Sequence, residues 1–483
     1  MWPDQVRAFR KHSLVDTREL IGLTVLLGAY GVVFASDMQP EYLQFMNIVG
    51  PAFLAAVLAG GCWWQLAQDQ RSLWQPLVWF RLGCIAYYGV GSLAPYIAND
   101  ATVQFMQLLY AFSDEEALKV GLINVSCILI VLLSVWVVLR DHRAGSWAIA
   151  QRRLEVSQSK TLLFAAIFLI VGGVTRYLFV LPSSLGLIET LPGVVITVAK
   201  SYGVGLFLIV LASFRGSHIA LPISLALVPI DLVVGLLTFA KTEVLTTLIF
   251  AYLGLLHHKL NLSRILVGAS IVLAVFSQLD PPIHFGRDEL WRRHGKLEAP
   301  LEERLEILIS YFSGASDSGP MQETQTALSR LSYVNAAAMV VSWHDVGMTG
   351  DSLGYALTVM VPRFIWPDKP EITAIGADLY TAATAQTGSS ISPGLFAEAY
   401  WNFGWLGVPF LMIPLGIILG LFSQYSLYIG ETENWLHLPV VFLGVQIGTR
   451  VDGTYVADVI GASGIALVCA LMLFIIEITL SRR

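Results

Sequence analysis

The sequence predicts an all-α polytopic membrane protein with about twelve transmembrane helices and a large helical extracytoplasmic loop. Apolar residues make up 55% of its 483 residues and charged residues only 13%, whereas soluble domains carry about a quarter charged residues. The mean hydropathy is +0.67, and the apolar residues come in long blocks. The net charge of −6 indicates little about partners, because in a membrane protein the placement of charge matters more than its sum.

Long apolar blocks define the predicted membrane spans. A helix needs roughly 20 apolar residues to cross the hydrocarbon layer. Residues 102–112 are apolar but too short to cross, so we expect them at the membrane surface. The predicted spans are residues 19–36, 46–67, 76–97, 117–139, 160–181, 190–213, 218–239, 241–257, 263–279, 394–422, 435–450 and 454–480.

These spans divide the chain into three predicted regions. Residues 1–279 form an N-terminal transmembrane region of about nine helices. Residues 280–393 form the extracytoplasmic loop, and residues 394–483 form a C-terminal transmembrane region of about three helices. Residues 1–18 are polar and basic and lack a cleavable signal pattern, so the first span is expected to remain in the membrane.

The positions of lysine and arginine predict the orientation, because cytoplasmic segments carry an excess of both. The connecting segments 37–45, 98–116 and 182–189 lie on one side and contain neither residue. Segments on the other side carry Arg7, Arg10, Lys11, Arg18, Arg71, Arg140, Arg143, Arg152, Arg153, Lys160, Arg215, Lys259, Arg264, Arg482 and Arg483. We therefore expect both termini in the cytoplasm and the loop 280–393 on the extracytoplasmic face, which in a bacterial inner membrane is the periplasm.

The loop itself is predicted to be helical. Residues 301–312 have helical periodicity, with Leu301, Leu305, Leu308 and Ile309 on one face and Glu302, Glu303, Arg304 and Glu306 on the other. Further helices are expected over residues 322–344, 355–366 and 372–386. Residues 350–354 match G-x-S-x-G, but that motif needs a strand before it and an α/β sheet around it. We expect a turn that opens the next helix, with Asp351 or Ser352 as its cap.

Charged residues gather toward the predicted extracytoplasmic half of the protein. Charges within membrane spans are costly, so they are functional candidates. Several arginine or lysine side chains around one point can hold a diphosphate, and a nearby carboxylate can accept the proton of an attacking hydroxyl. The residues concerned are Arg176, Lys200, Asp231, Lys241, Glu243, Arg287, Arg292, Arg293, Arg330, Arg363, Lys369, Glu398, Arg450, Asp452 and Asp458.

Simpler interpretations exist for several of these charges. Arg176 could extend to the membrane surface, and Lys200 could pair with Asp231 between neighbouring helices. Arg292 and Arg293 could be solvated or contact lipid headgroups. The four cysteines all lie in apolar spans and fit neither a disulfide framework nor a zinc site. No phosphate-binding loop and no dinucleotide fingerprint is present in the sequence.

Residues 330–420 resemble the Wzy-type oligosaccharide repeat unit polymerases, the O-antigen and exopolysaccharide polymerases of bacteria. The resemblance lies in Arg330-Leu-Ser, then Gly350-Asp-Ser-Leu-Gly, then Pro362-Arg-Phe-Ile-Trp-Pro-Asp-Lys-Pro, and then Glu398-Ala-Tyr-Trp-Asn-Phe-Gly. Elsewhere only the topology is similar. The resemblance implies a GT-C-like membrane glycosyltransferase that is inverting and needs no metal or other cofactor. It would pass the growing glycan from undecaprenyl diphosphate to the next lipid-linked repeat unit, with a Wzz-type chain-length regulator as a possible partner.

The resemblance also implies roles for individual residues. Arg330, Arg363 and Lys369 would hold the donor diphosphate, assisted by Arg450 and by Arg287 of the loop. Glu398 would be the general base or would orient the acceptor, with Asp458 as the alternative. Arg176, Lys200 and Lys241 are secondary candidates. The aromatic residues Trp366, Tyr400 and Trp401 would stack on sugar rings or anchor the protein at the membrane surface.

Two other functions are compatible with the same pattern. An O-antigen ligase uses the same kind of donor but passes the glycan to lipid A core. A lipid-linked oligosaccharide flippase would need cations that face both sides of a central cavity, whereas the charges here favour one side.

The predicted orientation is testable by cysteine labelling. Ser316→Cys should react with a membrane-impermeant thiol reagent added outside the cell, and Ser146→Cys should not, because the lysine and arginine pattern puts residue 146 in the cytoplasm. Labelling of Ser146→Cys but not of Ser316→Cys would reverse the orientation and put the predicted site in the cytoplasm.

Overall fold

The computed structural model describes residues 14–36, 40–107, 109–139, 158–188, 191–258, 261–295, 298–313, 331–361, 365–366, 369, 374–385 and 390–481. Every regular element within these ranges is a helix. By its internal contacts the chain divides into two compact units. Unit 1 comprises residues 1–152, 321–432 and 440–483, and unit 2 comprises residues 153–320 and 433–439. Each unit joins segments distant in sequence, whereas the three predicted regions follow the order of the chain.

Ten helices within the described ranges are long and apolar enough to cross a membrane, which confirms a helical polytopic membrane protein. The two remaining predicted spans correspond to α12 (Lys241–His258) and to a shorter apolar helix, Trp435–Thr449. The ten are Thr17–Ala35, Pro40–Gln68, Pro76–Ile97, Asp114–Val137, Gln158–Ser184, Val195–Phe214, Ala220–Leu237, Ser263–His294, Leu395–Gly430 and Tyr455–Thr479.

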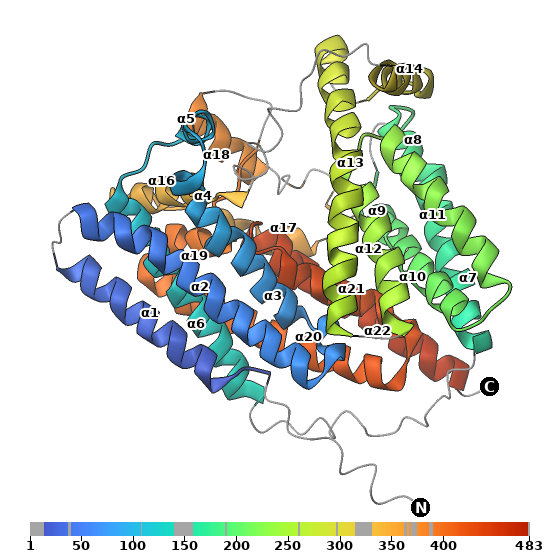
Figure 1. The fold of residues 1–483 in the computed structure, drawn as a ribbon, viewed down its shortest axis with the longest axis horizontal. Coiled ribbons are helices and arrows are strands. Elements are labelled where there is room, and N and C mark those ends of the chain that lie inside the picture. Colours follow the sequence, from blue (N-terminus) through green and yellow to red (C-terminus); the bar gives the residue numbers. More distant parts are fainter. Residues whose placement is uncertain are drawn as a thin grey trace, which may run out of the picture. The chain divides into compact units, whose positions relative to one another are not determined.

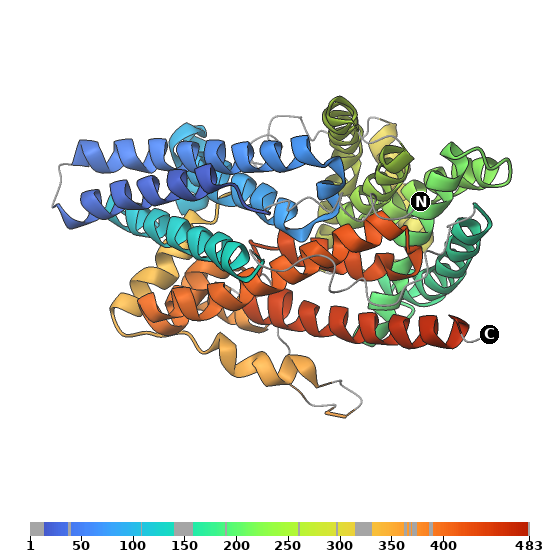
Figure 2. The same ribbon diagram turned by 90° about the horizontal axis from the view of Figure 1, so that it is seen from below.

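Unit 1 is built around α1, α2 and α6, which pack side by side, and around α20, which packs on α6 (Figures 1 and 2). Buried aliphatic side chains from these helices form its core. Helix α21 (Leu438–Thr449) begins in the short segment of unit 2 and continues in unit 1. The other elements of unit 1 are α1 (Thr17–Ala35), α2 (Pro40–Gln68), η2 (Gln70–Trp74), α3 (Pro76–Cys84), η3 (Ile85–Val90), α4 (Gly91–Ile97), α5 (Asp100–Gln107), α6 (Asp114–Leu139), α16 (Val334–Asp345), η7 (Ser352–Tyr355), α17 (Ala356–Met360), α18 (Ala374–Thr384), α19 (Leu395–Phe403), η8 (Gly404–Leu406), α20 (Gly407–Thr432), η10 (Tyr455–Gly461) and α22 (Ala462–Ser481).

One ion pair of unit 1 is fully buried. Arg81 of α3 donates hydrogen bonds of 2.7 and 2.8 Å to the two carboxylate oxygens of Glu19 on α1. It donates a third, of 2.6 Å, to Gln65 of α2. The Arg81 and Glu19 side chains are only 0% and 1% exposed. Because both charged side chains are buried and find their partners in each other and in Gln65, the pair holds three membrane helices in one relative arrangement.

Unit 2 is organised around α10, in which every residue from Tyr202 to Ala212 is buried. A helix that is apolar on all sides belongs in the interior, and α10 packs against α7, α11 and α12. The elements of unit 2 are α7 (Gln158–Thr175), η5 (Arg176–Val180), α8 (Leu181–Ser184), α9 (Gly193–Ala199), α10 (Ser201–Phe214), α11 (Ala220–Leu237), α12 (Lys241–His258), α13 (Leu262–His294), α14 (Leu301–Phe312) and η9 (Trp435–His437).

Helix α13 extends well beyond the predicted end of its span at residue 279. It continues through Pro281 and Pro282 to His294, so the first part of the predicted loop is helical. Proline removes a backbone donor, but neighbouring packing can hold such a helix together. Here Ile283 and Leu290, which follow the two prolines, are both fully buried.

The remaining loop helices are present but mostly shorter than predicted. The prediction over 322–344 corresponds to α16, and residues 321–330 lie outside the described ranges. The predictions over 355–366 and 372–386 correspond to α17 and α18. Helix α14 has the predicted bounds, and its buried residues are Ile307 and Arg304, the latter from the predicted charged face. Arg304 tolerates burial because three backbone carbonyls accept its hydrogen bonds.

Breaking the buried ion pair of unit 1 should destabilise the protein strongly. Arg81→Leu leaves the Glu19 carboxylate buried without its partner, at a cost of about 3–5 kcal/mol. Adding Glu19→Leu should recover much of the loss, because no buried charge then remains. Thermal unfolding of the purified protein in detergent measures both effects.

The matched control is Arg71→Ala. Arg71 forms an exposed pair with Asp69, its side chain being 45% exposed, so its loss should cost less than about 1 kcal/mol. A melting temperature equally lowered by Arg71→Ala and Arg81→Leu would contradict the role given to the buried pair.

Candidate functional site

The predicted site residues are divided between the two units. Unit 1 contains Lys369, Glu398, Arg450 and Asp458, whereas unit 2 contains Arg176, Lys200, Lys241 and Arg287. Arg330 and Arg363, which the resemblance assigns to diphosphate binding, lie outside the described residues.

In unit 1, the turn of residues 450–454 joins α21 to the π-helix η10. Val451 anchors this turn, because its carbonyl accepts a 2.6 Å hydrogen bond from the Tyr88 hydroxyl and a 3.1 Å bond from the backbone N–H of Leu395. The Ser392 hydroxyl donates a 2.9 Å bond to the carbonyl of Gly453. The 450–454 turn is therefore fastened both to η3 and to the start of α19.

Charged side chains gather on this turn. The Arg450 guanidinium lies 3.9 Å from the Asp458 carboxylate, which also accepts a 3.0 Å hydrogen bond from the backbone N–H of Thr454. The Tyr333 hydroxyl lies 3.4 Å from a carboxylate oxygen of Asp452. Burial, reinforced by the Asp452 charge, raises the pKa of Tyr333, so its phenol remains a donor at neutral pH. We call Arg450, Asp452, Asp458 and Tyr333 the turn cluster.

The turn cluster is accessible at its charged end. The Arg450 side chain is 51% exposed and that of Asp458 is 21% exposed. An arginine offers several N–H donors in a planar fork that matches phosphate oxygens. A carboxylate beside it can accept a proton from a hydroxyl group. The turn cluster therefore combines an anion-binding group with a proton acceptor.

Glu398 is linked to the turn through Tyr455 and is almost completely buried, with 1% exposure. One carboxylate oxygen accepts a 2.6 Å hydrogen bond from the Ser352 hydroxyl of η7. The other accepts a 2.6 Å bond from the backbone N–H of Tyr455, the first residue of η10. The Asn402 side chain donates a 2.8 Å bond to the Ser352 hydroxyl. Glu398 thus joins three segments, α19, η7 and η10.

The entry to α19 requires a glycine. Gly394 has φ +81°, a conformation that other residues rarely adopt. A side chain at this position would also begin 2.8 Å from the Tyr88 hydroxyl. Both effects keep α19 close to the 450–454 turn, which allows Glu398 to reach Tyr455.

The partners of Glu398 are neutral among the described residues. They are the Ser352 hydroxyl and the backbone N–H of Tyr455, whereas Arg330 and Arg363, predicted for the same site, lie outside those residues. Asp351 or Ser352 was expected to cap the following helix, but Asp351, at the N-cap of η7, makes no side-chain cap bond, and the Ser352 hydroxyl contacts Glu398. Lys369 donates hydrogen bonds of 3.2 and 2.9 Å to the carbonyls of Thr358 and Val361.

The candidate sugar-binding aromatics have separate environments. Tyr400 is buried and donates a 2.9 Å hydrogen bond to Asp345, so its ring is not free to stack on a ligand. Trp401 packs near Trp343, at 6.5 Å between ring centroids, and donates a hydrogen bond to the Met348 carbonyl. Trp366 is 44% exposed and remains the most accessible of the three.

Unit 2 contains a second charged group. Arg176, the first residue of the π-helix η5, lies 2.8 Å from both Asp231 and Glu243. The buried Asp231 also accepts hydrogen bonds from the hydroxyls of Tyr177 and Thr247. Asp231 therefore pairs with Arg176, a partner that differs from the Lys200 considered from the sequence.

The other cations of unit 2 lie elsewhere. Lys241 lies 2.6 Å from Asp280 and also contacts His284. Lys200 lies at the junction of α9 and α10, and Arg287 is on α13; both side chains are exposed. Within the described part of the chain, no three histidine, cysteine, aspartate or glutamate side chains are arranged to hold a metal ion.

One candidate residue of each unit, Arg176 and Asp458, lies in a π-helix. The π-helices η3, η5 and η10 carry or begin with Tyr88, Arg176 and Asp458. Such segments are rare and occur frequently at functional sites, because the altered hydrogen bonding redirects side chains. This feature supports the turn cluster as the candidate site of unit 1.

Comparisons with known proteins give no family assignment: no family model, no curated protein and no solved structure matches the chain.

Ser352→Ala should destabilise the protein, because the Glu398 oxygen and the Asn402 amide would each lose a buried partner. The expected cost is about 1–3 kcal/mol. The matched control is Ser426→Ala, since Ser426 is equally buried but its hydroxyl bonds only the carbonyl of Phe422 within its own helix. Thermal unfolding should show a clear loss for the first variant and little change for the second. Identical melting of the two variants would remove Ser352 from the support of Glu398.

Proposed function

We propose that the protein is a bacterial inner-membrane polysaccharide polymerase with a GT-C-like fold of about twelve spans. It transfers the growing glycan from undecaprenyl diphosphate to the non-reducing end of a lipid-linked repeat unit. The reaction is inverting and metal-independent, and it takes place on the periplasmic face. The resemblance of residues 330–420 to Wzy-type polymerases suggests the reaction, and the turn cluster supplies groups suited to it.

One observation carries this proposal: the exposed Arg450 fork stands beside the Asp458 carboxylate, on a turn between α21 and the candidate membrane span Tyr455–Thr479. The end of a membrane helix is where the headgroup of a polyprenyl lipid lies, since its hydrocarbon chain stays in the bilayer. A diphosphate there meets a bidentate donor without leaving the membrane surface. The same donor stabilises the negative charge that grows as the diphosphate leaves the sugar carbon.

The proton in this reaction needs an acceptor. A hydroxyl of the acceptor sugar attacks the anomeric carbon, the bond from that carbon to the diphosphate oxygen breaks, and the hydroxyl proton passes to a base. We assign this role to Asp458, which is partly exposed. Both oxygens of Glu398 are engaged and its side chain is buried, so we assign it a positioning role.

The remaining cations fit supporting roles in the same proposal. Arg330 and Arg363 would complete the diphosphate site, as the resemblance implies. Lys369 fixes the carbonyl end of α17 through Thr358 and Val361. It therefore positions this segment in our proposal, in contrast to the direct diphosphate contact that the resemblance implies.

Purified protein in lipid nanodiscs, given undecaprenyl-diphosphate-linked repeat units without lipid A core, should form a ladder of polymer lengths. Asp458→Asn should slow elongation by about 10²–10⁴-fold, the usual contribution of a general base. Arg450→Ala should also abolish the ladder, and Arg450→Lys should restore little, because an ammonium cannot replace the bidentate fork. Gel separation of the labelled glycans measures elongation by each of the three variants.

The control is Arg71→Ala, an exposed arginine outside the turn cluster, which should elongate normally. Wild-type protein that forms product only after lipid A core is added would support the ligase alternative. Repeat units that move across the bilayer without joining would support the flippase. Normal elongation by Asp458→Asn would remove that carboxylate from the reaction.

A further inference from the structure

Helix α14 of unit 2 has three distinct faces. The first is buried and consists of Arg304 and Ile307. The second is polar and contains Glu303 and Glu306. The third is apolar yet exposed, and we call it the α14 stripe: Leu301, Leu305, Ile309 and Phe312 are 45%, 42%, 66% and 70% exposed. Residues spaced in this way lie along one side of a helix. Four large apolar side chains exposed in one row indicate a surface that contacts another apolar surface, such as a membrane or a protein.

The buried face fixes where α14 lies. The Arg304 guanidinium donates hydrogen bonds of 2.7 Å to the carbonyl of Ser184 and 3.1 Å to that of Leu237. It donates a third, of 3.0 Å, to the carbonyl of Ala299. Ser184 and Leu237 are the last residues of the candidate membrane spans Gln158–Ser184 and Ala220–Leu237. Arg304 therefore holds α14 at the level where two spans leave the membrane.

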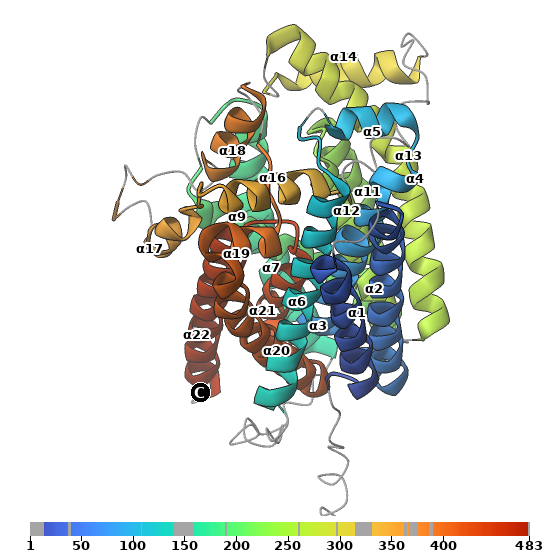
Figure 3. The same cartoon turned by 90° about the vertical axis from the view of Figure 1, so that its left-hand side faces the viewer.

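The orientation of α14 agrees with this position. Figure 3 shows α14 lying crosswise at the end of α13, which runs along the direction of the bundle. A helix at the end of membrane spans and crosswise to them runs along the membrane surface. Ile307 packs into an apolar core with Phe239, Ile283 and Leu290, so the helix cannot roll freely about its axis.

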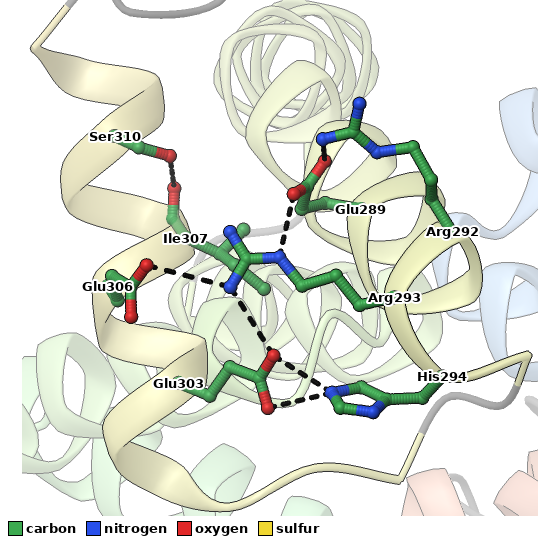
Figure 4. A network of polar contacts seen from close by, with 8 residues as sticks. All are labelled: Glu289, Arg292, Arg293, His294, Glu303, Glu306, Ile307 and Ser310. Carbon is green, nitrogen blue, oxygen red and sulfur yellow. Dashed lines mark hydrogen bonds and ion pairs between the residues drawn. The ribbon is translucent and has the colours of Figure 1, made fainter.

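The polar face is held by a network with the end of α13 (Figure 4). Arg293 lies 3.3 Å from Glu303 and 3.5 Å from Glu306. His294 lies 2.8 Å from both oxygens of Glu303, and this contact lowers the pKa of the Glu303 carboxyl, so the polar face stays charged. With one face on the protein and another on this network, the rotation of α14 is fixed and the α14 stripe points away from both.

We propose that α14 is an interfacial helix whose stripe of Leu301, Leu305, Ile309 and Phe312 inserts into the lipid bilayer, in the leaflet where α8 and α11 end. A helix with one apolar and one charged side suits the boundary between headgroups and acyl chains. Its charged side carries Glu302, Glu303 and Glu306, so attraction to anionic lipids does not drive the insertion. Apolar burial drives it, and the insertion should therefore not require anionic lipid.

Spin labelling tests this proposal in the full-length protein, reconstituted into phosphatidylcholine vesicles. The background carries Cys62→Ala, Cys84→Ala, Cys127→Ala and Cys469→Ala. Nitroxides are attached at Leu305→Cys, Ile309→Cys and Glu306→Cys. Leu305 and Glu306 form a matched pair, because they are consecutive, both exposed, and on different faces. At each position, two collision rates of the nitroxide are compared. One is with oxygen, which concentrates in lipid, and the other is with a nickel complex that is soluble only in water.

Oxygen collisions should exceed nickel collisions at positions 305 and 309, and the reverse should hold at 306. The same result is expected when a third of the lipid is phosphatidylglycerol, in keeping with apolar insertion. Nickel collisions dominating at 305 and 309 would put the stripe in water. Low rates for both reagents at these positions would mean that protein covers the stripe. Either result overturns the proposal, and neither depends on the proposed polymerase activity.

Discussion

The Glu398 carboxylate links the elements that form the candidate site. Its two oxygens connect α19 to η7 through Ser352 and to η10 through the backbone of Tyr455. A buried carboxylate is costly unless donors satisfy both oxygens, so this arrangement tolerates few alternatives. Once Tyr455 is held, the preceding turn has a defined position, and the Tyr88 hydroxyl also holds this turn through the carbonyl of Val451. The exposed Arg450 and Asp458 are thus carried on a rigid support, as precise chemistry requires.

The same principle recurs in the rest of the protein. Arg81 joins α1, α2 and α3 through Glu19 and Gln65, and Arg304 joins α14 to the ends of α8 and α11. In a membrane, the apolar effect does not select among helix arrangements strongly, because lipid is as apolar as a leucine side chain. Buried polar groups that find partners in only one arrangement supply the missing selectivity.

The sequence predicts the membrane architecture well, because span length and composition follow directly from bilayer thickness. It predicts α14 with correct bounds but not which residues are buried, because the carbonyls that accept the hydrogen bonds of buried Arg304 come together only in the fold. The partners of Glu398 could not be found from the sequence, since Ser352 and Tyr455 lie far from it along the chain. The resemblance and the rarity of a charge in an apolar helix both marked Glu398, but neither signal separates a catalytic role from a structural one.

The central claim is that the turn held by Glu398 presents Arg450 to a diphosphate. It is tested most directly by the melting temperature of the purified protein with and without undecaprenyl diphosphate, which carries no sugar. A ligand that binds only the folded state raises this temperature. The account predicts a rise in the wild type and in Asp458→Asn, and a much smaller one in Arg450→Ala. An equal rise in Arg450→Ala and the wild type would contradict it.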